Sequence, residues 1–165
     1  MHTQISRKEL ILAEHVVSAV EAARRMDGPL EDVEAWARRM RERDELFGIW
    51  AAEGGVFVYP DFQFGGYAAP AQIKALLTVL RTRAGFDSEH ADRGGWARAY
   101  WLYQPHPLLS KRALASLDGS RLDSVSTAQA LSRIDDTPRT PAETFAEHPA
   151  AVIAVAKGLA PQSHP

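Results

Sequence analysis

The chain has 165 residues, a formal net charge of −2, no cysteine, and 45% hydrophobic residues. The length fits one large domain or two small ones. The lack of cysteine excludes disulfides and thiolate chemistry, and the small net charge gives no sign of a polyanionic partner. Because no run reaches the roughly 18 apolar residues that a membrane helix needs, and the first ten residues lack the apolar core of a signal peptide, we expect a cytoplasmic protein without a membrane partner.

The first part of the chain predicts helices separated by short breaks. Ser6 and Glu9 fit a capping box that opens a helical region over 7–26, which is either one helix or two with a break near 17–18. Asp27-Gly28-Pro29 should end this region, because glycine favours the position after a helix and proline cannot continue one. Proline is also favoured as the first residue of a helix, so the next helix is predicted to start near Pro29, with Glu31 and Asp32 in its first turn.

The stretch Gly54–Phe64, GGVFVYPDFQF, carries the clearest strand signal. Its β-branched and aromatic residues over 56–59 fit an extended strand, and the two glycines supply the positive φ of a tight turn. Residues 46–50 can pair back as the first arm, and Pro60 should end the second arm because it has no N–H to donate. The order helix, tight turn, helix, hairpin is the outline of a winged helix-turn-helix, with paired helices over 19–26 and 30–41.

A group of arginines near the end of the second paired helix is the candidate DNA-binding site. It consists of Arg38, Arg39, Arg41 and Arg43. Such side chains contact phosphates in DNA-binding modules, but residues 19–60 hold six basic against nine acidic residues, a net charge of −3. The alternative is a solvated helix face with intrahelical ion pairs, in a module that only packs or dimerises.

The rest of the chain predicts only helices, so the expected fold is mainly α-helical, with a module over 1–60 and a helical domain over 61–165. Pro70 opens a helix with a clean buried face at Ile73, Leu76, Leu77 and Leu80. The aromatic stretch Trp96–Gln104 favours a core helix over a cofactor pocket. Two shorter helices are expected over 107–117 and 124–134. Thr140-Pro141-Ala142-Glu143 combines three helix-start signals, and Pro149 opens the last helix.

No catalytic, cofactor or metal site is predicted from the residues. The sequence has no P-loop and no dinucleotide fingerprint, and its six histidines are scattered without ligand spacing. We therefore expect a protein that is not an enzyme and that uses no cofactor or metal.

Three motifs together resemble the toxin-binding domain of the Xre/MbcA/ParS antitoxin family. They are YPDFQF over 59–64, GWARAYWLYQPHPLL over 95–109, and RTPAETFAEHPAAVIAVAKGLA over 139–160. Members of the family show a similar tyrosine-proline run, then a tryptophan-bearing helix that ends at a proline corner, then arginine-threonine-proline before two short helices. Two departures stand out. The corner Gln104–Pro107 has no asparagine, and the segment Ser110–Pro138 is longer than in the compact form of the domain, so its role is open.

The resemblance implies a bacterial antitoxin that neutralises a RES-domain toxin, a class that consumes NAD or uses it for ADP-ribosylation. It implies that the C-terminal helical domain covers the toxin's active-site cleft and that the antitoxin does no chemistry itself. The residues expected to face the toxin, exposed on a platform of two short helices, are Arg139, Glu143, Glu147, His148 and Lys157. Operator DNA and a second copy of the chain are further expected partners.

Two other functions stay open on the sequence. One is a winged helix-turn-helix transcriptional regulator without a toxin partner. The other is a small enzyme or ligand-binding domain that uses the aromatic cluster as a pocket. It ranks last because the sequence offers no positioned acids and bases.

Overall fold

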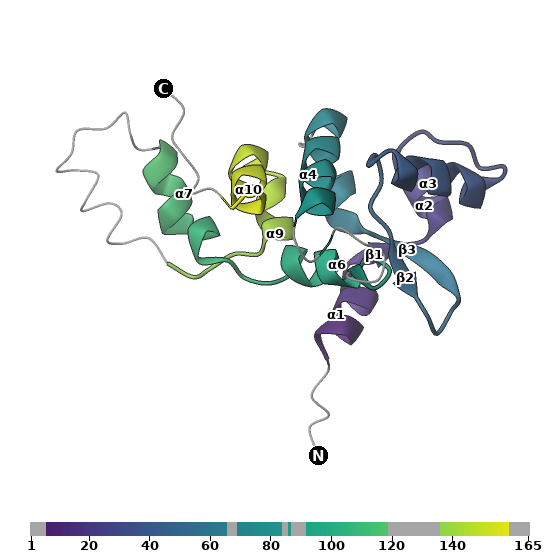
Figure 1. Ribbon diagram of the computed structural model, residues 1–165, viewed down its shortest axis with the longest axis horizontal. Coiled ribbons are helices and arrows are strands. Elements are labelled where there is room, and N and C mark those ends of the chain that lie inside the picture. The colour runs from purple at the N-terminus through teal and green to yellow at the C-terminus, as the bar shows by residue number, and fades with distance from the viewer. Residues whose placement is uncertain (1–5, 66–68, 84–85, 87–91, 119–135, 159–165) are drawn as a thin grey trace, which may run out of the picture.

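The computed structural model describes residues 6–65, 69–83, 86, 92–118 and 136–158 (Figure 1). The fold is mainly helical with one small antiparallel sheet, which confirms the expected fold class. In chain order the described elements are α1 (Arg7–Glu14), β1 (Val16–Val17), α2 (Ala19–Arg25), α3 (Val33–Glu42), β2 (Ile49–Ala51), β3 (Val56–Pro60), the 3-10 helix η1 (Asp61–Phe64), α4 (Pro70–Thr82), α6 (Trp96–Leu102), the 3-10 helix η2 (Pro107–Leu109), α7 (Lys111–Asp118), α9 (Pro141–Phe145) and α10 (Pro149–Ala156). None of these helices is long and apolar enough to cross a membrane.

The sheet is built on the predicted hairpin but has a third strand. β2 and β3 pair antiparallel with Trp50 opposite Phe57, and Gly55 supplies the positive φ of the turn between them. β1 pairs with the other edge of β3, so the strand order is β1-β3-β2. The predicted hairpin thus gains one short strand from outside it. β1 is only two residues long, too short for a periodic signal, and it is extended because β3 offers it a free edge.

The helical region before the sheet divides into α1 and α2, the second of the two predicted alternatives. The capping box at the start of α1 is present, because the Ser6 hydroxyl accepts from the Glu9 N–H and the Glu9 carboxylate accepts from the Ser6 N–H. Ser18 caps α2 by accepting from the Glu21 N–H. The strand β1 lies between these two capped helices and fixes the break.

The connection from α2 to α3 differs from the expected tight turn. Asp27, not Gly28, takes the left-handed position after α2 at φ 52°, and the Gly28 N–H donates to the Ala23 carbonyl at 2.8 Å. α3 begins at Val33 and not near Pro29, because Asp32 at φ 50° is also left-handed and a left-handed residue cannot lie inside an α-helix. Acidic residues 31 and 32 thus precede α3 instead of forming its first turn.

Two apolar cores hold these elements together. The smaller core lies between α2, α3 and the sheet, and it includes Ala22, Ala37 and the fully buried Tyr59. The larger core combines residues from both halves of the chain: Ile11, Phe47, Ile49, Phe62, Leu76, Leu77, Leu80, Leu102, Phe145 and Val152 are among its members. The described parts of the predicted module and of the helical domain therefore share one core.

The helical half follows most of the predicted starts. Pro70, Pro141 and Pro149 each begin a helix, and the expected face of α4 is buried. α10 packs along α4, with the yellow and teal helices side by side in Figure 1. The single helix expected over 107–117 is instead η2 followed by α7, because the Ser110 hydroxyl accepts from the Ala113 N–H and starts a new helix. The helix expected over 124–134 lies outside the described residues.

Candidate functional site

The YPDFQF motif forms a structural junction. Gln63 is buried and its side chain makes three hydrogen bonds: it accepts from the Phe47 N–H at 2.8 Å and donates to the carbonyls of Phe47 at 2.9 Å and Pro60 at 2.8 Å. The Tyr59 hydroxyl accepts from Arg41 at 2.6 Å, and Phe62 packs edge-on against Phe145 with ring centres 5.9 Å apart. Through these contacts the motif connects η1 with the loop before β2 and with α9.

The three motifs of the antitoxin resemblance meet in space. Besides the pair of phenylalanine rings, the His106 N–H donates to the Arg139 carbonyl at 2.9 Å, in an isolated antiparallel bridge between the proline corner and the start of the third motif. The His106 Nδ1 also accepts from the Leu108 N–H at 3.3 Å. Burial, and then the nearby charge of Arg83, lowers the pKa of His106. These contacts make the second motif a scaffold for α9 and α10.

The five residues expected to face a toxin lie on or beside α9 and α10, and three of them contact one another. Arg139 pairs with the Glu147 carboxylate at 3.0 Å and donates to the Glu143 carbonyl at 3.3 Å. The hydrogen bond from Arg139 lowers the pKa of Glu147. The Glu143 carboxylate accepts from the Thr140 N–H at 2.9 Å and completes the predicted capping box.

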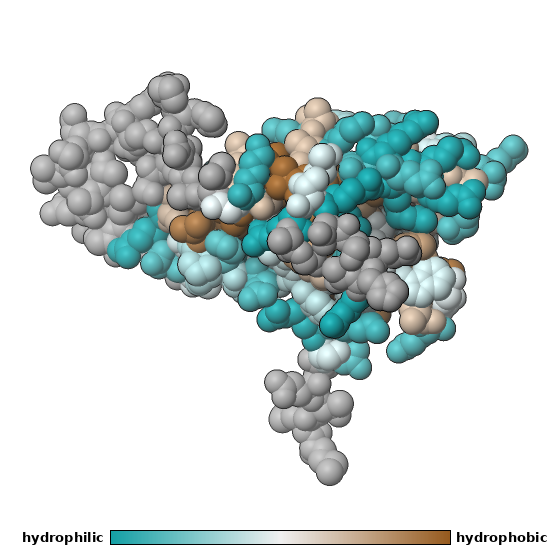
Figure 2. Space-filling model, viewed as in Figure 1, coloured by the Kyte–Doolittle hydropathy of each residue, from teal (hydrophilic) through white to brown (hydrophobic). Residues whose placement is uncertain are grey.

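The same surface presents both charged and apolar groups. Glu143, Glu147 and Lys157 are exposed, whereas Arg139 and His148 are half-buried. Figure 2 shows apolar residues reaching the surface around α10, while the surface over α2 and α3 is mostly hydrophilic. The face around α9 and α10 therefore offers a mixed surface of the kind that protein partners contact.

The four arginines of the candidate DNA-binding site do not act as one cluster. Arg38, Arg39 and Arg43 are exposed. Arg41 is half-buried. Its guanidinium carbon lies 3.8 Å from the centre of the Phe57 ring, and its side chain donates to the Tyr59 hydroxyl. Arg41 is thus held by the wing and is not free to follow a phosphate backbone.

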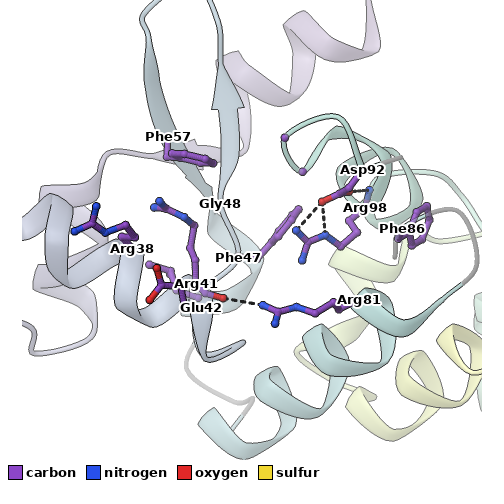
Figure 3. A pocket seen from close by; sticks show the side chains of 13 residues that line it. Arg38, Arg41, Glu42, Phe47, Gly48, Phe57, Arg81, Phe86, Asp92 and Arg98 are labelled. Atoms are coloured by element: carbon purple, nitrogen blue, oxygen red, sulfur yellow. Dashed lines mark hydrogen bonds and ion pairs between the residues drawn. The ribbon is translucent and has the colours of Figure 1, made fainter. Parts of the chain in front are cut away.

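A pocket of about 620 Å³ lies where the wing meets the helical half (Figure 3). It opens between the end of α3, the loop before β2, β3, the last turns of α4 and the segment 92–98. Among the residues that the structure describes, its wall carries two carboxylates, Glu42 and Asp92, and four arginines: Arg38, Arg41, Arg81 and Arg98. The sequence predicted neither the pocket nor the roles of Arg81 and Arg98, because no local pattern indicates that α3, α4 and α6 converge.

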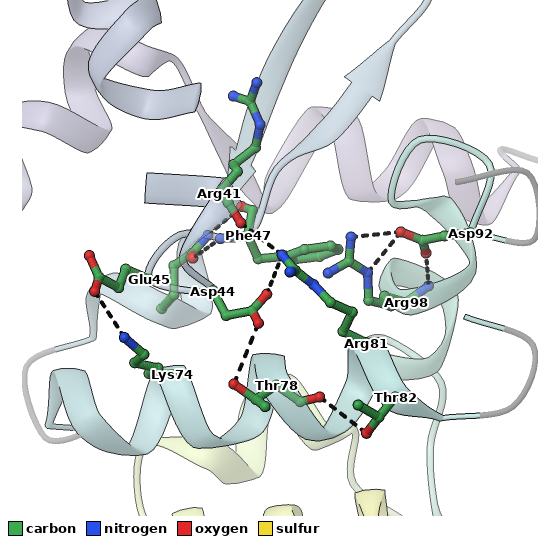
Figure 4. A network of polar contacts seen from close by, with 11 residues as sticks. Arg41, Asp44, Glu45, Phe47, Lys74, Thr78, Arg81, Thr82, Asp92 and Arg98 are labelled. Atoms are coloured by element: carbon green, nitrogen blue, oxygen red, sulfur yellow. Dashed lines mark hydrogen bonds and ion pairs between the residues drawn. The ribbon is translucent and has the colours of Figure 1, made fainter. Parts of the chain in front are cut away.

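Buried carboxylates hold two of these arginines in place (Figure 4). The buried Asp92 carboxylate accepts from Arg98 Nε at 2.8 Å and pairs with its Nη2 at 2.6 Å, and the Arg98 guanidinium carbon lies 4.7 Å from the centre of the Phe47 ring. Arg81 pairs with the buried Asp44 at 2.6 Å and donates to the carbonyl of Arg41 at 3.0 Å. The network ties the end of α3 to α4.

The turn before α6 closes this junction by a tight backbone approach. Gly94 and Gly95 both have positive φ, 70° and 95°, and the Gly94 carbonyl accepts from the Trp50 N–H at 2.8 Å. A Cβ on Gly95 would collide with the carbonyl oxygen of Gly48. The Trp96 indole N–H donates back to the Trp50 carbonyl at 3.0 Å. The two glycines therefore allow α6 to pack against β2. The glycine pair directly before an aromatic helix was the sequence feature that could have indicated this close contact.

Within the part of the chain that the structure describes, no group of three or more histidine, aspartate or glutamate side chains is placed to hold a metal ion. Comparison of the chain with models of protein families, with curated proteins and with solved structures finds no match. The resemblance to the antitoxin family stays a hypothesis that rests on the three motifs.

Proposed function

We propose that the chain is an antitoxin that binds and neutralises a RES-domain toxin through the face formed by α9 and α10. The observation that supports this proposal is the meeting of the three family-like motifs. Residues 59–64, 95–109 and the start of the third motif pack on one another through the Phe62–Phe145 ring contact and the His106–Arg139 bridge. A shared packing role explains why these separate motifs would occur together in one domain.

Charge on the proposed face supports the contact. A cleft that binds the phosphates of NAD needs basic groups, and Glu147 is an exposed carboxylate in the turn between α9 and α10 that could oppose them. Glu147 already pairs with Arg139, but the Glu147 side chain is largely exposed in this ion pair. Replacing Arg139 by a basic group of a toxin as the partner of Glu147 therefore costs little free energy. The apolar groups around α10 would supply the buried centre of such an interface.

The test is a charge reversal at Glu147, with purification and enzyme assays as readouts. Glu147→Arg removes the acid and leaves the Glu143 cap intact, whereas deletion of residues after 138 would also remove core residues. Because truncating a desolvated charge pair costs a few kcal/mol, we expect Glu147→Arg to weaken inhibition of NAD consumption by at least about tenfold and to reduce co-purification with the cognate toxin. The matched control is Glu53→Arg, an exposed acid on the hairpin turn far along the chain.

Three results would decide against parts of this proposal. Parental inhibition by a folded Glu147→Arg variant would place the acidic contact elsewhere. Equal loss in the Glu53→Arg control would point to overall charge and not to this face. If the parent itself neither bound nor inhibited a cognate RES-domain toxin, the proposed function would be refuted.

A second candidate is a transcriptional regulator, which the order α1-β1-α2-α3-β2-β3 favours as a winged helix-turn-helix arrangement. The module is net acidic, so we expect weak, strongly salt-dependent duplex binding. Arg39→Ala with Arg43→Ala, both exposed and outside the pocket, should lower the salt slope by about one phosphate contact each. Sequence-specific nanomolar binding at physiological salt would instead favour the regulator as the main function.

A further inference from the structure

We propose that the arginine-lined pocket at the junction binds a small anion that carries phosphate or carboxylate groups. This site is separate from the face on α9 and α10, so it does not depend on the antitoxin proposal. A volume of about 620 Å³ is within the range of small-molecule pockets. Guanidinium groups present planar pairs of donors that match both phosphate and carboxylate oxygens.

Three of the four arginines are held rigid by the protein itself. Arg41 is fixed by the Tyr59 hydroxyl and the Phe57 ring, Arg81 by Asp44 and a backbone carbonyl, and Arg98 by Asp92 and the Phe47 ring. They come from three different helices, α3, α4 and α6, and Figure 3 shows their guanidinium groups around one hollow. Side chains already held in place lose less conformational entropy on binding, which favours affinity.

Each of these guanidinium groups keeps donors that no described residue uses. An arginine has five N–H donors. In bonds to described residues, Arg41 uses only Nη1, Arg81 only Nη2, and Arg98 only Nε and Nη2. Arg38, the fourth arginine of the wall, makes no hydrogen bond or ion pair with any described residue. The arginines that line the pocket therefore keep several charged donors that no described residue uses.

The carboxylates that the structure describes near the pocket do not cancel this charge. Asp92 and Asp44 each neutralise one arginine, Arg98 and Arg81 respectively. Among the described residues that line the pocket, Glu42 at the exposed end of α3 is then the one carboxylate left beside Arg38 and Arg41. The guanidinium groups of Arg98 and Arg41 already lie over the rings of Phe47 and Phe57. The pocket therefore recognises the charge of its ligand and does not need the ligand to contain a planar ring.

The test measures binding of two probe anions to the full chain by isothermal titration calorimetry at constant ionic strength, because salt screens exposed charges. The probes are pyrophosphate for phosphate chemistry and citrate for carboxylate chemistry. We expect saturable binding of at least one of them, with one site per chain and a Kd below about 1 mM. The stronger of the two probes identifies the chemical class of the natural ligand.

Arg38→Gln is the test variant, since it removes a wall donor that bonds no residue described in the structure, and circular dichroism verifies its fold. It should weaken binding by about tenfold, the effect of losing one charge-assisted hydrogen bond. Arg39→Gln is the matched control: the adjacent residue is an exposed arginine of the same helix that does not line the pocket, and its substitution should leave the Kd unchanged.

Every other outcome overturns the proposal. No saturable binding of either anion by the folded parent would mean that the pocket is not an anion site. Equal weakening by Arg38→Gln and Arg39→Gln would show diffuse charge attraction. Parental affinity in Arg38→Gln would place the bound anion outside this pocket.

Discussion

Replacement of Gln63 with alanine tests whether the YPDFQF motif holds the two halves of the chain together. The Gln63 amide accepts from the N–H of Phe47 and donates to the carbonyls of Phe47 and Pro60, all within 2.9 Å. Gln63 is 6% exposed, so water cannot easily replace the lost side chain. Gln63→Ala would leave one buried donor and two buried acceptors without partners.

The cost follows from these three hydrogen bonds. A typical intramolecular hydrogen bond contributes about 1 kcal/mol net, so the loss is about 3 kcal/mol, and an unsatisfied buried N–H raises it further. Native proteins are stable by about 5–15 kcal/mol, so this loss is a large share of the total. For a chain of this size each kcal/mol corresponds to about 2–4 °C, so Tm should fall by roughly 6–12 °C.

Urea denaturation and thermal melting, both followed by circular dichroism, measure the effect. Gln104→Ala is the control, because Gln104 is exposed and its side chain makes no hydrogen bond with a described residue. Its stability should stay within about 0.5 kcal/mol of the parent. If Gln63→Ala lost no more stability than Gln104→Ala, the three hydrogen bonds would not support the junction and the structural role given to the motif would be wrong.

Three further substitutions test the packing around the junction and the proline corner. Gly95→Ala should lower the free energy of unfolding, measured by urea denaturation, by at least about 3 kcal/mol, because a steric clash adds to the cost of a left-handed backbone. Gly55→Ala has the same backbone cost but no atom within 4 Å of the new Cβ, so it should lose only about 1–2 kcal/mol. Equal losses in the two variants would contradict this. Arg98→Met leaves the buried Asp92 without its ion-pair partner, with only the N–H of residue 98 still bonded to it, and should cost about 3–5 kcal/mol. Addition of Asp92→Leu should recover part of this loss, and a double variant no more stable than the single one would argue against the pair. Because the folded state lowers the pKa of His106, the unfolded state binds the proton more readily, and the free energy of unfolding should fall as the pH drops through about 6.5. Urea denaturation at about pH 7 and about pH 5 should show a smaller fall for His106→Asn than for the parent. An equal fall in both proteins would refute the assignment.

Signals that act over a few residues were visible in the sequence. The boxes at Ser6 and Thr140 use side chains three positions away, and Pro70, Pro141 and Pro149 start helices because of their own ring geometry. The hairpin was likewise predictable from β-branched residues around a glycine turn. The predicted start of α3 was wrong because Asp32 has a left-handed backbone. α3 therefore begins after Asp32 and not at the favourable proline before it.

The sequence by itself thus determined the helical class of this protein, the starts of α1, α4, α9 and α10 and the position of the wing. Only the tertiary structure decided the third strand, the shared core and the pocket. The physical reason is the distance along the chain over which the deciding bonds act: Gln63 bonds a residue 16 positions away, Arg81 one 40 positions away, and Trp96 one 46 positions away. Such bonds leave no periodic trace, so the arginines that line the pocket resembled ordinary surface charges until α3, α4 and α6 were placed beside one another.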